Sequence, residues 1–350
     1  MNRLTSLLGI KYPIIQGPFG GFASQKLSAA VSEAGGLGSI GAHSLEPSAI
    51  TDVIGEMRSL TSKPFAINLW VLMADEGITS SGEADFGRSL APLARHIQAF
   101  GGELPSYKPF TPMRIEDQVR ALIDAKVPVF SFIYGIPPRE LLDECRKQGI
   151  KLVGTATTPD EALALEGAGV DAVVASGFEA GGHRGSFLGR AEESLTGTFS
   201  LTPQVADLLK VPVVAAGGIG DARGVAAAMA LGADGVQVGT AFLACRDSGA
   251  SDAHRQILLS GRPVSTGLTK GFTGRLARGV RNPLMDELNR PGVETLPYPL
   301  QRHLVRNLSA LAEQAGRTDL LPLWSGQSAG LSKYKDASEL LESLASGLPQ

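Results

Sequence analysis

Cysteine, aromatic residues and long apolar runs are all scarce in this chain. Only two cysteines, Cys145 and Cys245, occur in 350 residues, which argues against a disulfide scaffold or a metal cluster. Apolar runs stay well short of the roughly 18 residues that span a bilayer. The net charge of -3 gives no electrostatic case for nucleic acid or an anionic membrane. We therefore expect a cytoplasmic protein that holds no metal.

The first residues, MNRLTSLLGIKYP, carry a basic residue and a short apolar patch. Lys11 interrupts that patch and no small-residue cleavage site follows, so we expect no signal peptide. Glycine, in contrast, is abundant, with 43 residues against a usual level of about 7%. Most of these glycines lie next to apolar β-branched runs, which indicates turns at strand ends.

Eight short apolar runs alternate with helical patterns along the chain. Continuous apolar runs separated by helices are typical of a parallel sheet that is buried on both faces. Eight such units predict an α/β protein with a (β/α)₈ TIM barrel, and an open doubly wound sheet is the alternative. The predicted strands cover residues 13–17, 37–42, 64–71, 127–132, 151–156, 171–176, 211–218 and 234–240.

About 250 residues suffice for such a barrel, so the surplus must lie elsewhere. We expect the barrel in residues 1–240, with a polar, proline-rich excursion at about 73–113 that contains a helix near 87–100. Residues 241–330 are expected to be mainly helical and to cover the substrate. A C-terminal helix in 331–350 is expected to pack back on the barrel.

The turns after the seventh and eighth strands read AAGGIGDARG and VQVGTAF. Gly217 and Gly218 permit close backbone approach, and the free N–H groups at the start of the following helix favour an anion. Gly239 and Thr240 repeat the arrangement one strand later. Because barrel enzymes often bind phosphate at these two turns, we predict a phosphate site here.

His183 lies in SGFEAGGHRGSF (176–187), among glycines. A surface loop would explain one histidine there. The alternative is a site where the backbone passes close to a ligand while one imidazole reaches over it. An imidazole with an ordinary pKa near 6.5 can accept a proton at neutral pH.

Several motifs together resemble the nitronate monooxygenase family, formerly called 2-nitropropane dioxygenases. They are QGPFGG, PFAINL, GFEAGGHRGSF, AAGGIGD, QVGTAFL, FTGRLARGVRN and WSGQSAGL, in order from residue 13 to 331. The resemblance implies an FMN enzyme that oxidises alkyl nitronates with O₂ to a carbonyl compound and nitrite. It also implies a small-molecule substrate and a monomer or homodimer.

By the same resemblance, His183 is the catalytic base or orients the substrate. The implied FMN contacts are Gly17, Pro18, Asn68, Thr155, Ser176, Gly181, Gly217, Gly218, Gln237, Val238, Gly239, Thr240, Ser325 and Gln327. Two departures stand out. Ser176 replaces a longer polar residue of many relatives, and Ile133 stands where several relatives carry a second active-site histidine.

Two alternatives share the implied scaffold. One is an FMN-dependent reductase that uses NAD(P)H, of the enoyl-acyl-carrier-protein or quinone type. The other is a flavin-binding protein without turnover, although pure binding needs no base at position 183. A basic run, Lys270, Arg275, Arg278 and Arg281, is interpreted as a charged helix face, or else as a feature that attracts an anionic substrate.

Overall fold

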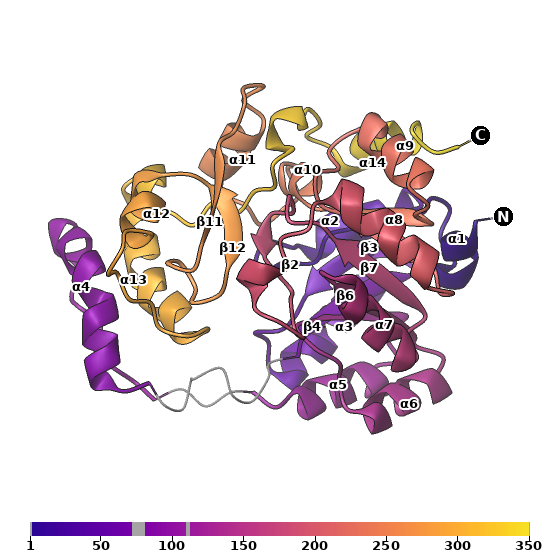
Figure 1. Cartoon of the computed structure of the whole chain (residues 1–350), viewed down its shortest axis with the longest axis horizontal. Coiled ribbons are helices and arrows are strands. Elements are labelled where there is room, and N and C mark those ends of the chain that lie inside the picture. Colours follow the sequence, from indigo (N-terminus) through magenta and orange to yellow (C-terminus); the bar gives the residue numbers. More distant parts are fainter. Residues whose placement is uncertain (1, 72–80, 110–112, 350) are drawn as a thin grey trace.

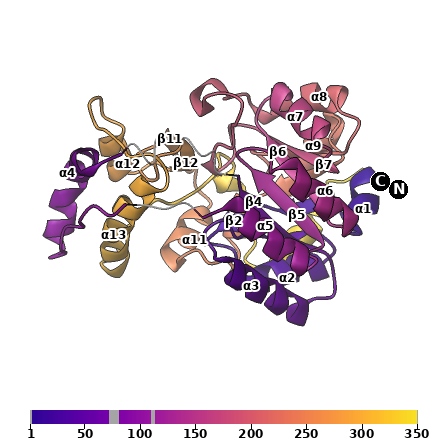
Figure 2. The same ribbon diagram turned by 90° about the horizontal axis from the view of Figure 1, so that it is seen from below.

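The computed structural model describes residues 2–71, 81–109 and 113–349. A sheet surrounded by helices forms the larger part, and a lobe of helices and short strands stands beside it (Figures 1 and 2). Both termini lie on the larger part, away from the lobe (Figure 1). Within the described residues, no helix is long and apolar enough to cross a membrane.

The larger part is built on a curled sheet of nine strands, all paired in parallel. Each of the eight predicted apolar runs forms a strand, so the predicted α/β class and parallel sheet are confirmed. A two-residue strand, β2, was not predicted. The strands, in sheet order, are β1 (Ile14–Gln16), β10 (Gly235–Val238), β9 (Val213–Ala216), β7 (Ala172–Ser176), β6 (Lys151–Ala156), β5 (Val129–Ile133), β4 (Phe65–Trp70), β3 (Gly38–Gly41) and β2 (Phe19–Gly20).

The two edge strands of this sheet, β1 and β2, come from consecutive segments of the chain. Ile15 of β1 forms a parallel bridge to Leu37, the residue before β3. Two hydrogen bonds accompany the bridge, from Leu37 N to Ile14 O (2.9 Å) and from Gln16 N to Leu37 O (2.9 Å). The curl of the sheet therefore brings its first strand back to the segment that leads into β3.

Helices follow most of the strands and lie outside the sheet (Figure 1). Local capping explains where several begin, because Ser24, Thr158 and Asp221 each accept hydrogen bonds from the N–H groups of the first helical turn. Inside the curl, Ile15, Val153 and Val214 belong to one apolar cluster with α1. The helices are α1 (Arg3–Leu8), α2 (Gln25–Glu33), α3 (Pro47–Leu60), α5 (Ile115–Asp124), α6 (Arg139–Lys147), α7 (Pro159–Gly167), α8 (Thr198–Leu208), α9 (Ala222–Ala230) and α14 (Ala337–Ala345).

Helix α14 follows the lobe in sequence but lies against the sheet. Its Leu341 and Leu344 share an apolar cluster with Ile14 of β1 and Val236 of β10. The end of the chain is thus part of the packing around the first and last strands. Burial of such leucines stabilises a fold by about 1.5–3 kcal/mol each.

The lobe contains an antiparallel sheet of order β11-β12-β8, which the sequence did not predict. Residues 241–330 are therefore less helical than expected. The reason is that β12 pairs with β8, which lies almost 100 residues earlier in the chain. The remaining elements are β8 (Gly182–His183), β11 (Thr266–Thr269), β12 (Ala277–Val280), α4 (Glu83–Ala99), α10 (Thr240–Leu243), α11 (Asp252–Leu258), α12 (Pro283–Leu288) and α13 (Leu300–Gln314), with 3₁₀ turns η1 (Ala191–Glu193), η2 (Thr318–Leu320) and η3 (Ala329–Leu331).

Helix α4 supplies the helix predicted in the excursion, of which residues 73–80 and 110–112 lie outside the described residues. Leu93 and Ile97 of α4 pack with Leu304 and Leu308 of α13 in one apolar cluster. Although α4 and α13 are some 200 residues apart, the two helices lie side by side (Figures 1 and 2).

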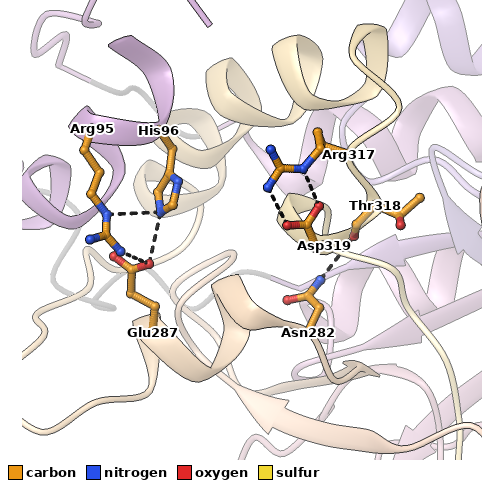
Figure 3. Close-up of polar contacts among 7 residues, drawn as sticks. All are labelled: Arg95, His96, Asn282, Glu287, Arg317, Thr318 and Asp319. Atoms are coloured by element: carbon orange, nitrogen blue, oxygen red, sulfur yellow. Dashed lines mark hydrogen bonds and ion pairs between the residues drawn. The ribbon is translucent and has the colours of Figure 1, made fainter. Parts of the chain in front are cut away.

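Polar contacts add to this junction at the outer side of the lobe (Figure 3). Glu287 of α12 accepts hydrogen bonds from Arg95 Nη2 (2.6 Å) and His96 Nε2 (3.0 Å), which both belong to α4. Nearby, Arg317 and Asp319 form an ion pair (2.7 Å). Arg95 is largely exposed, and ion pairs with an exposed partner contribute little, so we attribute most of the docking of α4 to the apolar cluster.

Candidate active site

A cavity of about 710 Å³ opens where the carboxyl ends of the parallel strands meet. Residues at the ends of β4, β6, β7 and β9 line it, and so do segments of the lobe. The carboxyl ends of strands are where barrel and other α/β enzymes place their sites. The fold therefore places this pocket between the sheet and the lobe.

Most of the residues named from the sequence surround this cavity. Two do not line it. The side chain of Val238 is fully buried in the apolar cluster behind β10, and Gln327 is exposed to solvent. Those that line the cavity are Gly17, Pro18, Asn68, Thr155, Ser176, Gly181, His183, Gly217, Gly218, Gln237, Gly239, Thr240 and Ser325.

The turn after β9 requires two glycines. Gly217 and Gly218 have φ angles of 98° and 74°, a region that side chains disfavour. A Cβ on Gly217 would also lie 2.9 Å from the carbonyl oxygen of Gly177 and 3.0 Å from Thr198 Oγ1. The backbone of the turn consequently passes very close to the start of the loop that carries His183.

The ends of β1 and β10 also approach each other at the backbone. Gly17 N donates to the carbonyl oxygen of Val238 (2.8 Å), and a Cβ on Gly17 would lie 3.0 Å from the Cα of Gly239. Thr240 Oγ1 accepts a hydrogen bond from Gly326 N (2.9 Å). Strand-end turns and the 325–328 segment thus form one continuous wall.

The loop after β7 is held by one buried and one half-buried charged side chain. Arg184, only 2% exposed, donates to the carbonyl oxygens of Ser176 (3.0 Å), Gly177 (2.8 Å) and Ser194 (2.9 Å). Glu179 accepts from the backbone N (2.9 Å) and Oγ1 (3.0 Å) of Thr198. Both side chains therefore hold the loop in place.

His183 is held by the small antiparallel sheet. Its backbone pairs with Ala277 of β12, and the backbone N of the next residue donates to the carbonyl oxygen of Leu276 (2.9 Å). The ring nitrogen Nε2 lies 2.9 Å from Thr273 Oγ1. Burial, with a smaller effect of the Arg302 charge, lowers the pKa of His183 to about 3. The imidazole is therefore neutral at pH 7.

Aromatic rings flank this imidazole. The indole of Trp70 lies 5.0 Å from the His183 ring, centroid to centroid, and that of Trp324 lies 5.3 Å away. Neither tryptophan was predicted as a site residue from the sequence, and nor was His43, which lines the same cavity. Trp70 is the last residue of β4, and His43 follows β3 by two residues. Their position at strand ends was the available signal, because barrel sites are built there.

Positive charge reaches the cavity from α13. Nη1 of Arg302 lies 3.2 Å from the Tyr298 hydroxyl and 3.4 Å from Nε2 of His43. Among the described residues, Arg302 has no carboxylate partner. Burial and this arginine both lower the pKa of His43. A cation beside neutral imidazoles is suited to an anionic ligand.

The basic run was interpreted as a charged helix face, and that interpretation is wrong. Arg278 lies on β12 and donates through Nε to the carbonyl oxygen of Phe178 (3.0 Å). Lys270 pairs with Glu192, and Arg281 pairs with Asp286 (2.7 Å). The guanidinium of Arg275 lies 3.9 Å above the centre of the Tyr134 ring.

A family model described as nitronate monooxygenase matches residues 1–347. The chain belongs to the nitronate monooxygenase family. A probable nitronate monooxygenase of Staphylococcus aureus (strain N315) is 40% identical over 350 residues, which cover 100% of this chain and 98% of that protein.

Two solved structures extend the comparison. A nitroalkane oxidase from Streptomyces ansochromogenes is 36% identical, with a TM-score of 0.88 over 98% of this chain and 96% of that one. FabK from Thermotoga maritima is 30% identical, with a TM-score of 0.76 over 99% of this chain and 96% of that one. Membership of the nitronate monooxygenase family makes this chain a flavin-dependent oxidoreductase.

The cavity of this nitronate monooxygenase relative fits a flavin. Asn68 donates through Nδ2 to Ser131 Oγ (3.0 Å), whereas its Oδ1 is buried and accepts no hydrogen bond from the described residues. Buried amide oxygens are normally satisfied, so this one indicates a bound donor. Gly17, Gly217 and Gly239 line the same cavity, so backbone rather than side chain faces a flat, anionic molecule there.

Proposed function

We propose that this enzyme oxidises alkyl nitronates, and nitroalkanes after their ionisation, with O₂ to a carbonyl compound and nitrite. The observation that carries the proposal is the imidazole of His183, which lines the same cavity as the glycine turns. The similarity to a nitroalkane oxidase at 36% identity supports the substrate class. Removal of the proton from the carbon next to a nitro group needs a base that is unprotonated at neutral pH.

We propose FMN as the flavin. When bound, FMN would supply the redox chemistry, and the chain supplies geometry and a proton acceptor. The ring end would be held by Gly17, Pro18, Asn68, Thr155, Ser176 and Gly181. The phosphate end would be held by Gly217, Gly218, Gln237, Gly239 and Thr240, with Ser325 beside it. Val238 and Gln327 are left with backbone contacts only, because their side chains point elsewhere.

His183 would remove a proton from the carbon next to the nitro group, or orient a substrate that arrives as the nitronate. Trp70 and Trp324 restrict where the substrate can lie against that ring. Arg302 places a positive charge in the same cavity and would favour the anionic nitronate over the neutral nitroalkane. Ile133 lines the cavity as an apolar wall and cannot exchange protons.

We further propose that the curled sheet is a (β/α)₈ barrel over residues 1–240, with 241–330 covering the substrate and 331–350 packing on the barrel. The bridge between Ile15 and Leu37 supports closure of the ring of strands. The cytoplasmic location and the monomer or homodimer also stay predictions from the sequence.

A reductase that uses NAD(P)H is the second candidate, and the similarity to FabK fits it. Anaerobic mixing of the purified yellow protein with propionate 3-nitronate or with NADH separates the two. We expect the nitronate to bleach the visible flavin absorbance while NADH leaves it unchanged. Fast bleaching by NADH alone would assign the protein to the reductases.

A further inference from the structure

Thr273 lies on the turn between β11 and β12, within the motif FTGRLARGVRN. Its side chain is 4% exposed and lines the cavity. Thr273 N and Gly274 N both donate to the carbonyl oxygen of Lys270, at 3.1 Å and 2.7 Å. The turn packs closely on the 296–298 segment, because a Cβ on Gly274, which has φ 90°, would lie 2.3 Å from the carbonyl oxygen of Leu296.

This hydroxyl has backbone partners on the same turn. Thr273 Oγ1 donates to the carbonyl oxygen of Arg275 (3.2 Å) and accepts from Arg275 N (3.4 Å). His183 Nε2 lies 2.9 Å from the same hydroxyl oxygen. When the single hydroxyl proton points at the Arg275 carbonyl oxygen, only a lone pair faces Nε2. The imidazole then donates through Nε2–H, and Nδ1 carries the lone pair.

We propose that Thr273 is the positioning residue of His183, selecting the Nε2–H tautomer so that Nδ1 is the nitrogen that accepts the substrate proton. In that step the C–H bond of the nitroalkane breaks, an Nδ1–H bond forms, and the electron pair stays on the nitronate. Nδ1 makes no hydrogen bond within the described part of the chain, and the ring lines the cavity.

The arrangement serves both protonation states. Neutral His183 and its imidazolium each donate through Nε2–H, so Thr273 accepts the same bond before and after proton transfer. A fixed tautomer matters because the wrong one presents an N–H where the base must present a lone pair. The transfer of the nitroalkane proton to Nδ1 rests on the proposed function, whereas the Nε2–H tautomer of His183 does not depend on it.

Nitrogen NMR of histidine-labelled holoenzyme tests the tautomer without turnover. His183→Asn identifies the resonances by their loss. We expect the wild type to show a protonated Nε2 and a bare Nδ1, and Thr273→Val to show a mixture of tautomers. A bare Nε2 in the wild type would overturn the inference even if the enzyme oxidises nitronates.

Kinetics test the consequence. Thr273→Val should lower kcat/KM for a neutral nitroalkane about tenfold or more, a fraction of the 10²–10⁴ that a general base contributes. Thr273→Ser should stay close to wild type, and Thr273→Val should add nothing in a His183→Asn background. Thr269→Val, which removes a buried hydroxyl bonded to Asn289 instead, is the matched control for folding of the lobe. Equal activity of Thr273→Val and the wild type would refute the positioning role.

Inactivity of the wild type on both nitroalkanes and nitronates would refute the proposed function and remove the proton-transfer step. The NMR result would still decide the tautomer. The two failures are therefore distinguishable.

Discussion

The imidazole of His43 stacks on the indole of Trp70, with ring centres 3.7 Å apart and planes within 7°. Trp70 in turn meets His183 edge to face at 5.0 Å. One indole therefore separates two neutral imidazoles in the same cavity. Because burial lowers the pKa of each histidine, neither ring repels a cation or competes with Arg302 for an anion at pH 7.

The chain has two tryptophans, Trp70 and Trp324, and both line the cavity. We expect titration of the apoprotein with FMN to quench most of the intrinsic fluorescence, because a flavin in the cavity lies close to both indoles. Trp70→Phe and Trp324→Phe should each remove part of the quenched signal. Flavin retention without quenching would place the cofactor elsewhere.

His183→Asn should retain FMN and lower kcat/KM for neutral nitroalkanes by roughly 10²–10⁴, the usual contribution of a general base. Activity on the nitronate prepared beforehand should fall much less, because that substrate has already lost its proton. Steady-state oxygen uptake with both forms of one substrate measures the difference. Equal losses on both would contradict the role as a base.

Gly239→Val should weaken FMN retention while leaving the fold intact. A Cβ at this position would meet only Phe19 Cε1, at 3.7 Å, so the backbone tolerates a side chain that must then project toward the cavity. Gly239→Ala is the matched control and should keep more flavin. The ratio of flavin to protein after gel filtration, with a thermal melt, measures both effects. Full flavin content in Gly239→Val would argue against the phosphate site.

Arg302→Met should raise the pKa of His183 and of His43, since a positive neighbour that disfavours protonation is removed. The acid limb of the pH profile of kcat/KM should move to higher pH, and KM for the anionic nitronate should rise. Arg281→Met, which removes an arginine paired with Asp286, is the control and should change neither. An unmoved acid limb in Arg302→Met would count against electrostatic coupling.

Stability should fall as the pH drops below about 6.5, the ordinary pKa of histidine in an unfolded chain. His254, 1% exposed, has its pKa lowered to about 4, mainly by burial. Below pH 6.5 the unfolded chain binds a proton at this histidine, whereas the folded protein does not. Each such histidine therefore lowers the free energy of unfolding by about 1.4 kcal/mol per pH unit, down to its pKa in the folded protein.

Urea unfolding of the holoenzyme at pH 7 and pH 5 measures this dependence. His254→Gln keeps a donor for the carbonyl oxygen of Trp324, which His254 Nε2 contacts at 3.0 Å. The variant should lose the part of the pH dependence of the unfolding free energy that one histidine contributes. The same pH slope in wild type and variant would show that His254 protonates normally in the folded protein.

The sequence predicted the strands well because each is a short, largely apolar run, and several, such as 13–17 and 211–218, end at glycine. Burial on both faces of a parallel sheet leaves that pattern in any single segment, as in 171–176 and 211–218. The short strands β8, β11 and β12 leave no such pattern. Gly182 and His183 form a strand only because β12 lies beside them.

Local chemistry also located much of the candidate site. The turn at 217–218 could be recognised because glycine permits close approach of the backbone. His183 could be recognised because an imidazole exchanges protons near neutral pH. The contacts of these residues were not visible. Thr273 meets His183 across 90 residues, and Arg302 meets His43 across 259, so nothing in either segment points to the other.

By itself, then, the sequence determined the parallel strands, the strand-end turns and the family, because each depends on residues that are neighbours in the chain. Tertiary structure alone decided the tautomer-selecting contact of Thr273, the aromatic walls around His183 and the depressed pKa of its ring. Those properties arise from burial and from contacts between distant segments, which exist only once the lobe has packed against the open ends of the strands.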